Sequence, residues 1–135
     1  MNEPSPAQVF RALEQMPNRL NTFWDEHGAT LVGEALDQSL PILGHLADVE
    51  LIYGARLRQA KLRDHASWQT LLAQTPSDKH ALLAQAAIAN FVRLRRWNLE
   101  HCREQDLVER RADVLIMIAQ HDRKRYRQLE QLVTS

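Results

Sequence analysis

The sequence is poor in the residues that cross-link small folds or interrupt helices. Its 135 residues include one cysteine, Cys102, four glycines and five prolines. A single cysteine excludes a disulfide within the chain and favours a reducing compartment. No apolar run reaches the roughly 20 residues that cross a bilayer, and residues 1–10 lack the basic start and apolar block of a secretory signal. We therefore expect a cytoplasmic protein that does not associate with a membrane.

An excess of one charge sign is also lacking. The chain has 17 basic and 17 acidic residues and hence no net charge. Residues 1–50 are acidic on balance and residues 91–135 are basic, but acids are interleaved with the bases, and no Gly-rich loop or aromatic–basic platform accompanies them. We therefore expect no nucleic-acid partner. Instead, the uneven charge predicts acidic and basic helices that pack together within one domain or across a dimer.

The sequence does contain long intervals without glycine or proline, and these predict helices. Sustained alternation of apolar and polar residues, which would indicate strands, is nearly absent. The predicted helices cover residues 6–27, 41–62, 78–102 and 107 almost to the end, while residues 63–77 form a connection with at most one short helical piece. Ser39 would cap the second helix, with Pro41 in its first turn. Four helices of similar length predict an all-α fold, a single antiparallel four-helix bundle over residues 1–135.

Two of the histidines lie on apolar faces of different predicted helices. In the last helix, His121 and Arg125 belong to a line of residues spaced by three and four, whose apolar members are Val114, Ile118, Leu129 and Leu132. In the second helix, His45 belongs to such a line with Ile42, Val49 and Ile52. Buried polar side chains are costly without a partner. The two histidines are therefore either hydrogen-bonded core residues or part of a metal or catalytic pocket.

Several segments resemble the DinB-like superfamily of damage-inducible and related four-helix proteins. The most specific are "GHLADVE" (44–50) and "HDRKRYRQ" (121–128), and "DHASWQ" (64–69) and "FVRLRRWNLE" (91–100) accompany them. The resemblance implies a homodimer and a divalent metal, zinc or nickel, held by three histidines inside the bundle. His45 matches the first of these and His121 the second, but the third position holds Arg125. Members of the superfamily include metal-dependent thiol S-transferases.

Arg125 is a departure that puts this metal site in doubt. A guanidinium does not lose its proton in proteins, so it cannot ligate a metal, and its charge repels a cation. One interpretation is a degenerate site in which Arg125 pairs with Asp48, Asp122 or another acidic group, in a protein whose biochemical role is unknown. It leaves a metal cofactor weakly bound or absent, and it leaves open whether the protein is an enzyme.

Two other interpretations keep a functional site. In one, the two histidines and Arg125 line a pocket for a small anionic or thiol ligand, with Asp48 beside it and Trp68 over its mouth. In the other, Asp48, Glu50 or His101 replaces the missing histidine and a metal still binds. Cys102, at the end of a predicted helix, is expected to be a surface residue and not a nucleophile. The remaining tryptophans are expected to be core anchors between helices.

Overall fold

The computed structural model describes residues 4–61 and 67–134, and within these ranges it contains helices and no strand. The α-helices are α1 (Pro6–His27), α2 (Gly33–Leu57), α3 (Trp68–Gln74), α4 (His80–Glu104), α5 (Leu107–Arg110) and α6 (Ala112–Thr134), and a 3-10 turn, η1 (Ser77–Lys79), precedes α4. The predicted all-α class is confirmed. None of the described helices combines the length and apolarity that crossing a membrane would need.

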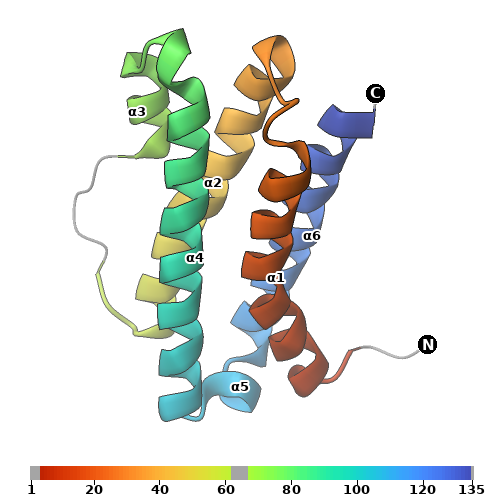
Figure 1. Ribbon diagram of the computed structural model, residues 1–135. Helices are drawn as coiled ribbons and strands as arrows, with labels where there is room; N and C mark the ends of the chain where they lie inside the picture. The colour runs from red at the N-terminus through yellow and green to blue at the C-terminus, as the bar shows by residue number, and fades with distance from the viewer. Residues whose placement is uncertain (1–3, 62–66, 135) are drawn as a thin grey trace.

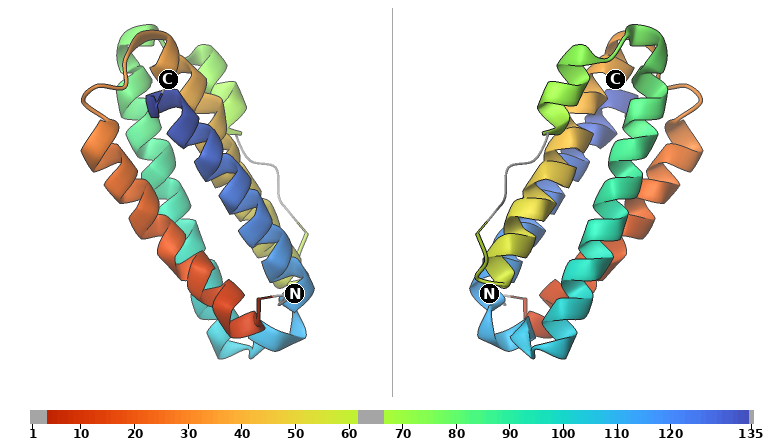
Figure 2. Two further views of the ribbon diagram at one scale, coloured as in Figure 1. Left: turned by 90° about the vertical axis from the view of Figure 1, so that its right-hand side faces the viewer. Right: turned by 90° about the vertical axis from the view of Figure 1, so that its left-hand side faces the viewer.

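The four long helices, α1, α2, α4 and α6, lie side by side, and the short helices α3 and α5 lie at opposite ends of the molecule (Figures 1 and 2). α1 packs against α4 and α6, and α2 also packs against α4 and α6. The pairs α1/α4 and α2/α6 are antiparallel, whereas α2/α4 and α1/α6 run in the same direction. The prediction that all neighbours are antiparallel is therefore wrong.

The parallel pairing of α2 and α4 follows from the position of α3. The Cβ of Trp68, the first residue of α3, would lie 2.8 Å from a Cβ placed on Gly44, so the chain has returned along α2 before α4 begins. Both carboxylate oxygens of Asp48 accept from the backbone N–H of Trp68 at 3.1 Å, which holds the start of α3 against α2. A long return connection of this kind lets two consecutive long helices share a direction.

The start of α2 differs from the prediction. The helix begins at Gly33, so Ser39 is not an N-cap and Pro41 lies in the helix interior. Ser39 is buried, and its hydroxyl donates to the carbonyl of Leu36 at 2.6 Å. Proline within a helix removes one backbone hydrogen bond. The earlier turns nevertheless stay helical because Leu36 and Leu40 pack into the core.

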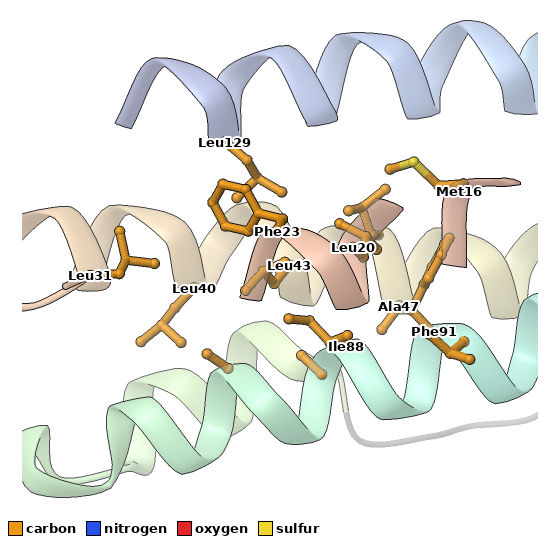
Figure 3. Close-up of a cluster of buried hydrophobic side chains, with 14 residues drawn as sticks. Met16, Leu20, Phe23, Leu31, Leu40, Leu43, Ala47, Ile88, Phe91 and Leu129 are labelled. Atoms are coloured by element: carbon orange, nitrogen blue, oxygen red, sulfur yellow. The ribbon is translucent and has the colours of Figure 1, made fainter. Parts of the chain in front are cut away.

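The apolar core consists of two clusters stacked along the helices. The upper cluster, part of which Figure 3 shows, includes Leu20, Phe23, Leu43, Phe91 and Leu129. The lower cluster includes Leu13, Leu57, Leu99, Cys102, Leu115 and Ile118. Along α2, α4 and α6 a buried charged residue separates the two clusters: Glu50, Arg95 and Asp122 respectively. The middle of the core is therefore polar.

Two predictions about single side chains are wrong. Cys102 is fully buried in the lower cluster, because the helix continues past it to Glu104. Burial raises the pKa of its thiol, so it is a poor nucleophile. Trp97 is no core anchor, since 54% of it is exposed. Instead, the guanidinium of Arg58 lies 3.5 Å from the centre of its ring.

Candidate functional site

His45 of α2 and His121 of α6 lie next to each other, because α2 and α6 pack in antiparallel fashion. The centres of their rings are 4.9 Å apart, with the ring planes at 50°. The ring of Tyr53 lies 6.5 Å from that of His121 in an edge-on arrangement. All three side chains are half-buried. The pair thus lies at the margin of the core, and the buried faces of the two helices pass instead through Glu50 and Asp122.

Both imidazoles are neutral at neutral pH. Burial, the neighbouring His45 and the positive charge of Arg125 together lower the pKa of His121 to about 4, and burial is the largest of these causes. Burial and Arg125 also lower the pKa of His45, against a smaller opposing effect of Asp48. Each ring therefore offers one N–H donor and one nitrogen lone pair.

Arg125 contacts the histidine pair directly and has no acidic partner in the described part of the chain. Its Nε lies 3.4 Å from Nε2 of His121, and its Nη1 donates to Oε1 of Gln128 at 3.0 Å. The predicted pairing of Arg125 with Asp48 or Asp122 is wrong, because both carboxylates are engaged by other groups. A positive charge therefore stands beside the two imidazoles without a carboxylate to balance it.

The other pocket candidates lie apart from this cluster. Asp48 accepts hydrogen bonds from the backbone N–H of Trp68. Its negative charge opposes the lowering of the pKa of His45. The indole of Trp68 packs against the upper apolar cluster, so it does not cover the imidazoles. The position of α3 explains both results, because α3 packs against α2 and α4 and makes no contact with α6.

These residues do not fit a three-histidine metal site. The third position holds a guanidinium, which cannot ligate, and its Nε–H points at the lone pair of His121 that a metal would need. The described residues include no group of three or more His, Cys, Asp and Glu side chains that could hold a metal ion. Of the substitute ligands considered above, Asp48 and Glu50 influence the histidine pKa values but are engaged by other groups, Asp48 by the backbone N–H of Trp68. Glu50 accepts hydrogen bonds from Arg95 and Asn98, and His101 lies near the far end of α4.

A buried ionic network, which sequence reasoning missed, lies beside the histidine pair. Arg95 of α4 is 1% exposed and donates to both carboxylate oxygens of Glu50 on α2, each at 2.9 Å. It also donates to both oxygens of Asp122 on α6 at 2.8 Å and to the carbonyl of Leu13 on α1 at 3.1 Å. Asn98 adds a hydrogen bond to Glu50 at 2.9 Å. One guanidinium therefore connects all four long helices.

The network is shielded from solvent and contains two carboxylates and one guanidinium. Burial raises the pKa of Asp122, and the charge of Arg95 offsets only part of this effect. Burial alone would lower the pKa of Arg95, but Glu50 and Asp122 raise it above its ordinary value, so the side chain stays charged. No buried side-chain nitrogen or oxygen of the described residues lacks a hydrogen-bond partner. Since Asp122 directly follows His121, the network fixes the rotation of α6 that presents His121 to His45.

A periodicity signal for this network is present in the sequence. Arg95 and Asn98 follow Phe91 at helical spacing, on the face that Ala84, Ala87 and Cys102 also share. Arg93 and Arg96, on either side of Arg95, are exposed. Like His121, Arg95 is a polar residue in a line of apolar residues spaced by three and four, and this spacing indicates a buried charge.

Comparisons of the chain with protein-family models, curated proteins and solved structures find no match. The DinB-like assignment therefore continues to depend on the segments of this sequence that suggested it.

The low pKa of His121 predicts a pH dependence of stability. Its pKa is about 4 in the folded protein and has the ordinary value of 6.5 in the unfolded chain. Between these values the unfolded chain binds more protons, so the free energy of unfolding decreases as the pH falls from about 6.5 towards about 4. We expect urea unfolding over this range to show a shallower pH slope for His121→Gln than for the unaltered protein.

Comparing the two pH slopes separates the contribution of His121 to the free energy of unfolding from that of Asp122. The raised pKa of Asp122 acts in the opposite direction, because its folded form gains a proton first, and this contribution is present in both proteins. Equal slopes would show that His121 is protonated in the folded state at no cost.

Proposed function

We propose that the protein is a DinB-like four-helix bundle in which the three-histidine metal site has become a histidine–arginine site for a small carboxylate-bearing ligand. The order of the long helices, with its longer connection between α2 and α4, supports the bundle assignment. The positions of His45 and His121 on facing helices support the derivation of this site from a three-histidine metal site. Low-molecular-weight thiols that carry a carboxylate belong to the same ligand class.

The observation that carries the proposal is the charge of Arg125. Its guanidinium lies beside two neutral imidazoles, and the described residues provide it with no carboxylate. A guanidinium donates in a planar fork that matches the two oxygens of a carboxylate. The imidazole N–H of His45 can donate a further hydrogen bond to the same anion, while Nε2 of His121 accepts from Nε of Arg125 and holds the guanidinium in place. An anion therefore complements this site, whereas a cation is repelled by it.

The site supports binding better than catalysis. A metal-dependent thiol transferase or hydrolase needs a Lewis acid to lower the pKa of a thiol or of water, and the donor set does not fit one. The homodimer stays a prediction of the resemblance. Ile52 of α2 and Met117 of α6, on the two helices that carry the histidines, are apolar and exposed.

Nuclear magnetic resonance titration with acetate and succinate tests the proposal. We expect saturable shifts of the His45 and His121 side-chain resonances at neutral pH, and an affinity that falls about tenfold in Arg125→Gln, because a charge-assisted hydrogen bond is lost. Arg127→Gln is the matched control, since Arg127 lies two residues away on the exposed side of α6 and the charge change is the same. Equal losses in both variants, or shifts that avoid the histidines, would contradict the proposal.

A further inference from the structure

A cleft separate from the histidine pair is formed by residues where α2 and α4 end and α5 connects to α6. Figure 1 shows that these helix ends lie together at one end of the molecule. Its volume is about 230 Å³. Its polar lining comes from Arg58, His101, Gln105, Arg110 and Arg111, and so from four successive parts of the fold: the end of α2, the end of α4, α5 and the residue between α5 and α6.

The arginines of this cleft have few acidic partners. Arg58 donates to the carbonyl of Gly54 at 3.0 Å and to the side chain of Asn98 at 2.6 Å, and it stacks on Trp97. Arg110 donates to a backbone carbonyl, that of Gln105, at 3.3 Å.

The third arginine, Arg111, has only a loose ionic contact, 3.7 Å from the exposed Asp113. Glu100 and Glu104 lie on the adjoining surface of α4 beside Arg58 and form no ion pair with it within 4 Å. The positive charge of the cleft is therefore mostly unbalanced within the described residues.

The backbone on both sides of the cleft adopts a sparsely populated conformation. Gln59, which follows Arg58, has φ of 53°, and Asp106, which precedes α5, has φ of 54°. They are the non-glycine residues with positive φ in the described ranges. Such residues cost about 1 kcal/mol or more and concentrate at ligand sites. Here they lie at the two turns that precede and follow the cleft arginines, Gln59 directly after Arg58 and Asp106 directly before the helix that leads to Arg110 and Arg111.

We propose that this cleft binds the phosphate group of a small phosphomonoester. The guanidinium group of Arg58, at the end of α2, and those of the adjacent Arg110 and Arg111 can donate to three oxygens of a tetrahedral dianion, whereas a carboxylate offers only two oxygens in one plane. Gln105 and His101 supply further polar contacts. A cleft of about 230 Å³ accommodates a single small group. The proposal does not depend on the function assigned to the histidine pair, because the two sites share no residue.

Calorimetric titration with inorganic phosphate and with phenyl phosphate, supported by amide chemical shifts, tests this proposal. We expect both ligands to bind and to shift the amides of residues 105–111. In the double variant Arg110→Ala with Arg111→Ala, the affinity falls by about tenfold or more. The control is Arg123→Ala with Arg127→Ala, which removes the same charge from the exposed side of α6 and leaves the affinity unchanged.

Other arms of the experiment decide the class of ligand. Acetate at equal ionic strength is expected to bind at least about tenfold more weakly than phosphate. Equal binding of acetate, equal losses in the two double variants, or tighter binding of a short oligonucleotide than of phenyl phosphate would each overturn the proposal. Should the cleft double variant fail to fold, the single substitution of the exposed Arg110→Gln carries the same expectation. Variants at Arg125 leave phosphate binding unchanged, which separates this site from the proposed carboxylate site.

Discussion

Replacing Arg95 by methionine is expected to lower the free energy of unfolding by about 3–5 kcal/mol. The substitution leaves Glu50 and Asp122 facing each other in the core without the guanidinium that both now contact. Two buried carboxylates without a counter-charge are far costlier than the lost packing of one side chain. Urea unfolding followed by circular dichroism measures the effect. For a domain whose total stability is typically about 5–15 kcal/mol, this loss is a large fraction of the total.

The neighbouring Arg96 provides the matched control. Arg96 is exposed on the same turn of α4, and Arg96→Met should change the free energy of unfolding by less than about 0.5 kcal/mol. Adding Glu50→Gln and Asp122→Asn to Arg95→Met should recover part of the loss, because these changes remove the unpaired charges. If Arg95→Met and Arg96→Met are equally mild, the network does not hold the four long helices together.

Replacing Arg125 by histidine is expected to raise the affinity for zinc or nickel by about tenfold or more. Position 125 lies one helical turn from His121, whose ring is already 4.9 Å from that of His45. A third imidazole at that position supplies the missing ligand, and the same change removes a positive charge that repels the metal. The unaltered protein should bind these metals no more tightly than a two-histidine site. Competitive metal titration at about pH 7.5, where both imidazoles are neutral, measures the difference.

Arg125→Gln separates the two causes of this gain. It removes the charge without adding a strong ligand, so its metal affinity should lie between those of the unaltered protein and Arg125→His. If Arg125→His folds and binds zinc no better, the degenerate-site interpretation fails. Tight metal binding by the unaltered protein would also defeat it, because an additional ligand would then have to exist.

Much of the helical structure could be predicted because its signals are local. The predicted first helix, residues 6–27, coincides with α1, whose Ser5 and Gln8 form reciprocal capping hydrogen bonds. The long intervals without glycine or proline predicted α4 closely, but the helix predicted from residue 107 almost to the end is divided at Arg111 into α5 and α6. The start of α2 was placed too late because a strong local signal, Ser39 followed by Pro41, was outweighed by the packing of Leu36 and Leu40 in the core.

The sequence was less informative about which residues of an apolar line are buried. His45 and His121 were expected inside the molecule, yet the buried lines of α2 and α6 are rotated towards Glu50 and Asp122. Adjacent residues of a helix are about 100° apart around its axis. The apolar residues next to a half-buried position are therefore often the same ones that lie next to a buried position, and the sequence pattern does not distinguish the two. The difference depends on how α2 and α6 are turned against α4, which no segment specifies by itself.

By itself, the sequence determined that this chain is all-helical, where most of its helices lie, and that His45, His121 and Arg125 fall on helical faces that could meet. These features depend on interactions within a few residues along the chain. Only the tertiary structure decided that α2 and α4 run parallel, that Asp48 holds α3 and Asp122 holds Arg95, and that Arg125 is left without a carboxylate. Each of these depends on competition among partners far apart in sequence, and a buried charge takes the partner that packing brings within hydrogen-bonding distance.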